Sequence, residues 1–347
     1  RLGVLDRIET LSLKRLKGVA ISSYEGEEIV IDYPQMPGMD ARPTSLSVPR
    51  YELDASFLVQ VKQVGVEVLE QHKVTEFLFA DGRVNGVSGL DESKTSFTLK
   101  APLVIDAGGR NAISLRKMGL KNKPAGNIKI AMAAHWQGAQ IADDYCCMHV
   151  SHPGYTGISS VGRDRSNVVL VVNRQSMNGE KPDKFYLDAV MRNGHRRKIL
   201  QDAECIESVR TIESLAFTVK PVTCGGLLLV GDAMGFIDPF TGEGIYLSLR
   251  SSEIAVEVAD KAFKKSDWSN DILMDYEMRR KQEFDKKFLL SRIFQKLIYN
   301  RFFCDRLVRA LRRKPELAET LVGVIGDLSP AQRAVSFNFL LRLLSAF

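Results

Sequence analysis

Hydrophobic residues in this chain of 347 residues form short runs in its first two thirds and helical periodicities toward its end. Residues 227–230 are an apolar run without polar alternation, which is typical of a strand buried on both faces of a parallel α/β sheet. Further along, Ile245, Leu249 and Ala255/Val256 recur at helical spacing. The pattern therefore predicts a strand, a loop and a helix within residues 221–262.

Short runs of alternating apolar and polar residues, separated by Gly, Pro, Asn and Asp, predict many strands before this segment. Glu25-Gly26 and Asp81-Gly82 lie between paired runs and predict hairpins. The predicted strands are 19–23, 28–33, 66–69, 74–79, 83–87, 97–100, 103–105, 128–136, 145–150, 157–161, 168–172 and 206–219.

Helical spacing of apolar residues predicts several helices. Asp54 is the expected N-cap of the first, and the second is expected to break near Asn193. The basic run 195–198 is better explained as a solvated face than as a phosphate site. The predicted helices are 54–64, 181–201, 268–311 and one that starts at Ser329-Pro330.

Polar residues follow the apolar run 227–230 in an order that indicates a ligand site. Asp232 places a carboxylate at the end of the predicted strand, where open α/β sheets bind ligands. Gly242 and Gly244 stand just before the predicted helix, where a ligand can approach backbone N–H groups. The helix dipole favours negative charge there, so an anionic ligand is expected.

The stretch GDAMGFIDPFTGEGI, residues 231–245, resembles the second FAD-binding motif of the p-hydroxybenzoate-hydroxylase-like flavoprotein superfamily. In that motif the aspartate binds the ribityl chain, and the helix start faces the pyrophosphate and the pyrimidine edge of the flavin. The alternative is an ordinary strand-to-helix crossover. The resemblance implies FAD as cofactor and implies that the following residues bind it: Asp232, Ala233, Pro239, Gly242, Glu243, Gly244 and Ile245.

Two positions place the motif within the superfamily. Aromatic hydroxylases carry His and Gln where this chain has Gly235 and Glu243, so the motif looks like that of the geranylgeranyl-reductase-like branch. Flavin halogenases carry a WxWxIP motif, whereas the only tryptophans here are Trp136 and Trp268. The spacing singles out no catalytic acid or base, so the catalytic residues stay unknown.

Two earlier stretches resemble further parts of the same superfamily. Arg50, which precedes Leu53 and Asp54, resembles an arginine that approaches the cofactor, where a cation can meet the pyrophosphate. The alternative is a surface arginine before a helix. A small β-meander is similar to one in the superfamily, and this implies that the backbone near Val74 lies by the adenine.

Residues 103–110 resemble the superfamily's Asp-Gly turn between a strand and a helix. This resemblance implies that Asp106 and Gly109 help to bind FAD. Gly108 and Ala112 depart from the motif, which also helps to place the nicotinamide donor. NAD(P)H therefore stays open as the electron donor.

The superfamily places a GxGxxG fingerprint upstream of these motifs, and this chain, which begins at Arg1, contains none. We expect a fragment without that N-terminal part; the alternative is a protein that never had it. The expected fold class is α/β (α+β), with an N-terminally truncated FAD-binding Rossmann-like sheet, an antiparallel β substrate layer and C-terminal helices. The expected parts are a substrate-side or linker segment (1–47), an FAD-binding part with a β-meander (48–120), an antiparallel substrate-binding domain (121–220), the FAD-binding Gly-Asp motif with its helix (221–262) and a C-terminal helical region (263–347).

Composition narrows the class of protein. Hydrophobic residues make up 45% and charged residues 26%, as in soluble globular proteins. No apolar run approaches the roughly 20 residues that cross a bilayer, and no secretory leader opens the chain. Five cysteines without a CxxC pair favour a reducing, cytoplasmic compartment.

His149 and His152 lack the further ligands of a metal site; they are either loop histidines or part of a substrate pocket.

The net charge is +6, and the basic residues between 279 and 309 face few acids in the sequence. A helix on an anionic membrane would explain them, as would an amphipathic helix packed on the body with a wet basic face. We expect no nucleic acid partner, because no recognition motif accompanies the charge. The oligomeric state stays open.

The leading prediction is an FAD-dependent oxidoreductase that transfers hydride through flavin N5 to or from a small hydrophobic, isoprenoid or lipid-like substrate. One alternative is an FAD-dependent monooxygenase that uses NAD(P)H and O2. Another alternative, from a different class, is a non-catalytic protein that binds a membrane or a partner.

Overall fold

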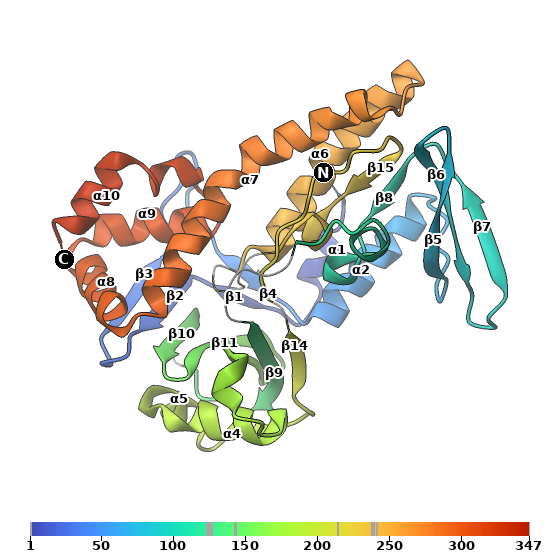
Figure 1. Ribbon diagram of the computed structural model, residues 1–347. Coiled ribbons are helices and arrows are strands. Elements are labelled where there is room, and N and C mark those ends of the chain that lie inside the picture. The colour runs from blue at the N-terminus through green and yellow to red at the C-terminus, as the bar shows by residue number, and fades with distance from the viewer. Residues whose placement is uncertain are drawn as a thin grey trace. The chain divides into compact units, whose positions relative to one another are not determined.

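The structure, a computed structural model, describes residues 2–122, 128–141, 144–213, 215–236, 240 and 242–346 (Figure 1). Its contacts divide the chain into two units. The five predicted parts follow the order of the chain instead, and their boundaries stay a prediction. The first unit comprises Arg1–Val68, Asn127–Leu215 and Arg292–Phe347, and the second comprises Leu69–Gly126 and Ala216–Ser291.

An eight-stranded sheet forms the centre of the first unit, in the order β13-β9-β12-β11-β10-β2-β3 with β14 also paired to β9. Neighbouring strands are antiparallel except β2 and β10, which run parallel. The predicted antiparallel layer is therefore confirmed. The strands are β2 (Gly18–Ser22), β3 (Glu28–Asp32), β9 (Lys129–Gln137), β10 (Tyr145–Ser151), β11 (Gly154–Gly162), β12 (Arg165–Asn173), β13 (Glu204–Cys205) and β14 (Arg210–Glu213).

Two short helices pack on this sheet, α4 (Pro182–Arg192) and α5 (Gly194–Leu200). Apolar side chains of α4 share one core with those of the strands because each helix turns an apolar stripe toward the sheet. Asn193 separates the helices, and its Oδ1 accepts the backbone N–H groups of His195 and Arg196 at 2.9 and 3.1 Å. The predicted break near Asn193 is confirmed. A 3-10 helix, η2 (Arg174–Met177), follows β12.

The N-terminal part of the first unit contains α1 (Leu5–Glu9), the helix α2 (Arg50–Gln63) and an antiparallel pair, β1 (Lys14–Leu16) with β4 (Ser45–Ser47). The predicted N-cap Asp54 is wrong, because α2 begins at Arg50 with Pro49 as its N-cap. Asp54 lies one turn inside the helix and pairs with Arg50 at 3.2 Å.

Three helices near the C-terminus complete the first unit: α8 (Arg301–Arg313), α9 (Pro315–Ile325) and α10 (Phe337–Leu344). The predicted helix start at Ser329-Pro330 is wrong. A 3-10 turn, η5 (Ala331–Arg333), follows Pro330, and α10 begins only where the Ser336 hydroxyl accepts the Phe339 N–H at 3.2 Å. The pattern of the sequence did not reveal α9.

The second unit contains a three-stranded antiparallel meander and a two-stranded parallel sheet. The 3-10 turns η1 and η3 follow the two parallel strands. Leu227, Leu228 and Leu229 are each at most 4% exposed, which confirms the predicted buried parallel strand. The elements are β5 (Lys73–Ala80), β6 (Arg83–Leu90), β7 (Ser96–Lys100), β8 (Val104–Asp106), η1 (Gly109–Asn111), α3 (Ile113–Lys117), β15 (Leu227–Leu229), η3 (Gly231–Met234) and α6 (Gly244–Lys265), with α7 (Asn270–Ile298) belonging to this unit as far as Ser291.

Two predicted strands differ from the structure. Residues 66–69 form no strand; Val66 and Leu69 are 54% and 40% exposed after the end of α2. Among the described residues of 206–219, only β14 is a strand, and it is followed by single bridges at Phe217 and Val219. Ala216 has a φ of 123°, which interrupts the extended chain there.

The helix α6 is present as predicted, and Ala255 of the predicted stripe is buried, but the other three stripe residues are not. Ile245, Leu249 and Val256 are 45%, 40% and 61% exposed. The face packed in the core consists mainly of small and β-branched residues, which approach the sheet closely: Ser251, Ile254, Ala255, Val258 and Ala262.

The basic residues of α7 face more acids than the sequence suggested. Phe284, Phe294 and Ile298 of its apolar stripe are buried, whereas Leu289 is 48% exposed. Part of the stripe therefore packs in the core, and a membrane contact of the basic helices stays a prediction. Several of its cations make ion pairs: Arg279 with Glu257, Arg280 and Lys281 with Glu277, and Lys287 with Glu243.

Candidate functional site

Two turns meet at the carboxyl ends of the parallel strands β8 and β15. Asp106, the last residue of β8, is in register with Leu229, the last residue of β15. The Val230 N–H donates to the Asp106 carbonyl at 3.2 Å, so the strands stay together as they end. The 3-10 turns η1 and η3 follow directly and contact each other. The structure therefore brings the predicted residues Asp106, Gly109, Asp232 and Ala233 to one edge, as expected of parallel strands.

Asp106 organises its own turn. Its side chain is 7% exposed, and its two carboxylate oxygens accept the backbone N–H groups of Gly108 and Ser114, each at 2.9 Å. Because Ser114 lies in the first turn of α3, the carboxylate also satisfies a donor at that helix start. Asp106 therefore fixes the backbone on both sides of Gly109, and its contact with FAD stays a prediction.

Gly231 holds the second turn against α6. Its N–H donates to the Ser251 hydroxyl at 2.9 Å. It has a φ of 59°, and a Cβ at this position would lie 2.9 Å from the Ser248 hydroxyl, so a larger residue would push the turn off the helix. The first two turns of α6 thus set the position of the next residue, Asp232, which is half-buried, and of Ala233, which is buried.

The start of α6 offers open backbone. A Cβ at Gly242 or Gly244 would meet no atom within 4 Å, and Gly109 in the other turn is equally open. The N-cap residue Glu243 makes no capping hydrogen bond with its side chain. An anionic group can therefore approach the positive end of the helix dipole here, which is what the pyrophosphate of FAD requires. The residues present fit FAD; Pro239 lies outside the described residues.

A buried ion pair joins the N-cap residue of α6 to the helix α7. Glu243 accepts from Lys287 of α7 at 2.8 Å, and both side chains are 7% exposed. The Lys287 ammonium also lies 4.5 Å from the centre of the Tyr246 ring. Ile245 is 45% exposed, so it contributes little to this packing. The sequence analysis did not identify Lys287 as part of the site. Its spacing from Phe284 and Phe294 places it on the buried face of α7, and a charged residue on such a face was the signal that could have found it.

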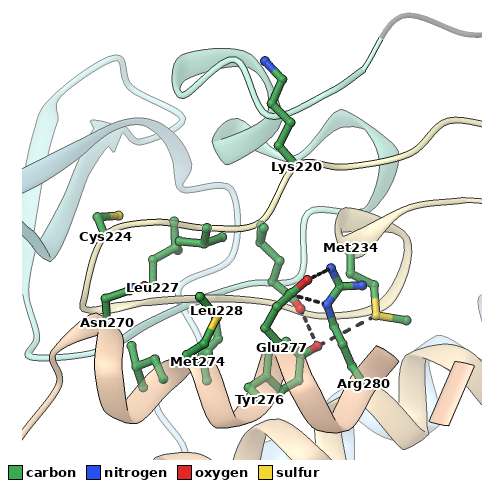
Figure 2. Close-up of a pocket in the computed structure, with 13 residues that line it drawn as sticks. Lys220, Cys224, Leu227, Leu228, Met234, Asn270, Met274, Tyr276, Glu277 and Arg280 are labelled. Atoms are coloured by element: carbon green, nitrogen blue, oxygen red, sulfur yellow. Dashed lines mark hydrogen bonds and ion pairs between the residues drawn. The ribbon is translucent and has the colours of Figure 1, made fainter. Parts of the chain in front are cut away.

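The helix α7 is also joined to the strand that precedes Asp232. The Tyr276 hydroxyl donates to the Leu229 carbonyl at 2.5 Å, and Arg280 makes two hydrogen bonds of 2.6 Å with Glu277 (Figure 2). These side chains line a pocket between α7, β15 and the loop before it. Met234 lines this pocket, but Asp232 and Gly244 do not, so it is distinct from the predicted cofactor residues.

The remaining predicted cofactor residues lie elsewhere in the fold. Val74 is half-buried on β5 of the second unit. Arg50 opens α2 of the first unit with its side chain 67% exposed and paired to Asp54. Their contacts with FAD stay predictions.

The basic run 195–198 is only partly the solvated face that we expected. Arg196 is completely buried and donates to Thr156 Oγ1 and to the carbonyls of Ala189 and Val190, at 2.8 to 3.0 Å. His149 is 5% exposed and shares a hydrogen bond of 2.7 Å with the Ser22 hydroxyl. No cluster of three metal-ligating side chains occurs in the part of the chain that the structure describes.

Comparison with known proteins identifies the family of this chain. The FAD binding domain family matches residues 1–282. Digeranylgeranylglycerophospholipid reductase 2 of Methanothermobacter thermautotrophicus is 28% identical over 304 residues, which cover 85% of this chain and 74% of that protein. The digeranylgeranylglycerophospholipid reductase of Methanocaldococcus jannaschii is 32% identical over 218 residues, which cover 61% of this chain and 54% of that protein. The matches therefore span from about half to about three quarters of these relatives.

A solved structure shares the fold. A flavoprotein/dehydrogenase from Cytophaga hutchinsonii superimposes with a TM-score of 0.84 at 18% identity, covering 99% of this chain and 84% of that one. This likeness confirms the predicted fold class. Among the described residues, no helix combines the length and apolarity needed to cross a bilayer. The chain belongs to the FAD binding domain family of flavin-dependent oxidoreductases, as the Gly-Asp motif predicted.

Proposed function

We propose that this chain forms the cofactor- and substrate-binding part of an FAD-dependent reductase that saturates carbon–carbon double bonds of an isoprenoid or other lipid-like substrate. The observation that carries the proposal is the meeting of the Asp106 and Asp232 turns beside the open start of α6. The similarity to two digeranylgeranylglycerophospholipid reductases supports the substrate class. Gly235 and Glu243 support the reductase branch over the hydroxylases.

When bound in its reduced form, FAD would supply a hydride to one carbon of the double bond and be left oxidised, and a proton from solvent would complete the saturation at the other carbon. In our proposal this chain binds and orients the cofactor. The Asp232 carboxylate accepts hydrogen bonds from cofactor hydroxyl groups, and the first N–H groups of α6 face negative charge. Asp106 holds the turn open at Gly109, and the pair of Glu243 with Lys287 fixes the helix start. A preorganised arrangement of this kind stabilises charge without rearrangement during the reaction.

The binding test uses the whole chain and its own flavin affinity. We expect Asp232→Ala to bind FAD about 10- to 100-fold more weakly, because a hydrogen bond to a charged group contributes about 1.5–3 kcal/mol. Flavin fluorescence or calorimetric titration measures the affinity. Asp285→Ala is the matched control: Asp285 is exposed on α7 and should leave the affinity unchanged. Equal affinities of both variants and the parent would contradict the assigned role of Asp232.

The reaction test supplies chemically reduced FAD and digeranylgeranylglycerophospholipid without oxygen. The proposal predicts a product that gains two hydrogens for each double bond reduced, detected by mass spectrometry. A product that forms only with oxygen and carries a new hydroxyl group would indicate the monooxygenase instead. Flavin binding without either product would reject the substrate class while leaving the cofactor site intact.

A further inference from the structure

The net positive charge of the chain lies entirely in its last segment. The chain has 48 Lys and Arg against 42 Asp and Glu, a net charge of +6. Residues 292–347 contain ten Lys and Arg and four Asp and Glu, which is also a net charge of +6. Residues 1–291 therefore carry no net charge. A positive charge excess confined to one segment favours the association of that segment with an anionic partner.

The helix α8 carries the densest part of this charge. Its buried face is apolar apart from Asp305, which is 2% exposed and accepts the Glu25 N–H at 3.0 Å. Its outward residues are only Arg and Phe, with no acid among them. These outward residues are Arg301, Phe302, Phe303, Arg306, Arg309, Arg312 and Arg313.

Three of these arginines line up along the helix. Arg306, Arg309 and Arg313 follow Phe302 at helical spacing, and none forms an ion pair with a carboxylate in the described part of the chain. Their recorded contacts are with neutral groups: Arg309 and Arg313 donate to backbone carbonyls at 3.4 Å. Arg301 and Arg312 of α8 pair with Glu25 and Glu27 at 3.7 and 3.2 Å. The charge of α8 that no acid neutralises therefore lies on these three arginines.

Exposed aromatic side chains lie within the same surface. Phe302 and Phe303 are 57% and 44% exposed, with ring centres 5.5 Å apart. The Arg306 guanidinium lies 4.2 Å above the Phe302 ring. Exposed phenylalanine beside arginine suits the boundary between lipid headgroups and acyl chains, where the ring enters the apolar layer and the cation meets phosphate.

The helix α10 adds apolar surface. Phe337 is 77% exposed and Leu341 is 49% exposed. The Lys314 ammonium, in the corner between α8 and α9, donates to the Arg342 carbonyl at 3.1 Å and to the Ser345 hydroxyl at 2.7 Å. Lys314 therefore joins the end of α8 to α10. Figure 1 shows α8, α9 and α10 gathered near the C-terminus.

We propose that α8, together with the exposed apolar residues of α10, is the surface by which this protein docks on a bilayer that contains anionic phospholipid. The proposal deepens the proposed function and rests on it in one respect: a lipid-like substrate has to be reached in a bilayer. It assigns the membrane contact to α8 and not to α7. The exposed Leu341 of α10 favours lipid over nucleic acid, because an aliphatic side chain neither stacks on bases nor forms hydrogen bonds with them.

Vesicle sedimentation of the whole chain tests the surface without flavin or substrate. The parent should bind vesicles of phosphatidylcholine with 30% phosphatidylglycerol at low salt, and bind poorly to phosphatidylcholine alone or at high salt. The variant Arg306→Gln/Arg309→Gln/Arg313→Gln should bind about 100-fold more weakly, since each surface cation contributes about 1 kcal/mol. The α7 variant Lys286→Gln/Arg292→Gln/Lys296→Gln removes the same charge from exposed positions and should bind like the parent.

Several outcomes would overturn the proposal. These are a parent that does not bind the anionic vesicles, a loss caused by the α7 variant and not by the α8 variant, and a parent that prefers an RNA competitor to the vesicles. Because the α8 variant could lose its fold, Phe302→Trp gives a second readout. Its fluorescence should shift to the blue on vesicles and be quenched by brominated lipid; an unchanged spectrum with bound vesicles would also reject the proposal.

These results are independent of the proposed reaction. The α8 variant should keep the flavin affinity of the parent, because the predicted cofactor residues of the Gly-Asp motif lie in the second unit and α8 lies in the first. Lost vesicle binding with intact flavin binding therefore supports the docking surface alone. A chain that binds vesicles but reduces no lipid would reject the proposed function and leave the docking surface standing.

Discussion

Lys287 of the second unit and Arg196 of the first are both buried cations, and they are held in different ways. In the second unit, Lys287 pairs with Glu243 at 2.8 Å, and each side chain is 7% exposed. In the first unit, Arg196 is completely buried and bonds only neutral oxygens: one hydroxyl and two backbone carbonyls. No carboxylate in the described residues pairs with Arg196.

The difference shows that burial alone does not determine what a charge does. The pair of Glu243 and Lys287 is locally neutral, so it contributes a fixed geometry at the start of α6 and little field beyond. Arg196 is not neutralised. Burial lowers its pKa to about 10, and its charge helps to lower the pKa of the neighbouring His149. In the second unit, the ion pair of Glu243 and Lys287 positions the start of α6. In the first unit, Arg196 binds two backbone carbonyls, and its uncompensated charge acts on neighbouring groups such as His149.

The largest expected effect comes from breaking the ion pair. Lys287→Met leaves the Glu243 carboxylate buried without its cation, and removing one partner of a buried pair costs about 3–5 kcal/mol. We expect urea unfolding of the whole chain to show a loss of that size. Flavin affinity should also fall, because Glu243 is the N-cap of α6.

A double variant distinguishes the lost pair from lost packing. Lys287→Met/Glu243→Gln removes both charges, so most of the stability should return. If the single variant costs less than about 1 kcal/mol, water reaches Glu243, and the contrast with Arg196 would be wrong.

The sequence predicted the backbone of this site better than its side chains. The run 227–230 and the strand ending at Asp106 were predictable, because a parallel strand buried on both faces has no polar alternation. The placement of Asp232 beside the start of α6 follows from the short connection between them. The sequence could not show which of the acidic residues is used to hold its own turn. Asp106 accepts the backbone N–H groups of Gly108 and Ser114, and only the folded turn shows this.

The errors share a physical cause, which is that periodicity does not say which face is covered. Ile245, Leu249 and Val256 fit a helical stripe, yet small residues on the opposite face allow α6 to pack closely on the sheet. Lys287 and Arg196 look like surface cations in the sequence, yet each is buried with a distant partner: Glu243 lies 44 residues from Lys287, and Thr156 lies 40 residues from Arg196. Arg196 also bonds two carbonyls of the preceding helix α4. Long-range partners of this kind are invisible to local pattern.

A smaller effect is expected at Arg196. Arg196→Met keeps much of the side-chain volume but leaves two buried carbonyls without their donors, which should cost about 2–3 kcal/mol. Urea unfolding measures the loss. The neighbour Arg197 is the matched control, because it is exposed and bonds one carbonyl at 3.0 Å; Arg197→Met should cost less than about 0.5 kcal/mol. Equal costs at both positions would mean that burial of Arg196 confers no special role.

The smallest effect sharpens the comparison through pH. His149 is buried, its Nε2 has no hydrogen-bond partner among the described residues, and burial, with the charges of Arg196 and His195, lowers its pKa from 6.5 to about 4. The folded state therefore binds fewer protons than the unfolded state. The stability from His149 is fully present above pH 6.5, falls as the pH drops from 6.5 to about 4, and is fully lost below that.

Between pH 7 and pH 5 this group should remove about 2 kcal/mol from the free energy of unfolding, measured by urea titration at each pH. His149→Gln should flatten this part of the profile. Arg196→Met should raise the pKa of His149 and shrink the loss, because it removes one of the two charges that oppose protonation. Lys287→Met in the second unit should leave this slope unchanged, since Lys287 is not among the groups that shift the pKa of His149. If Lys287→Met changed the slope as much as Arg196→Met does, the field of Arg196 would not be what distinguishes the two buried cations.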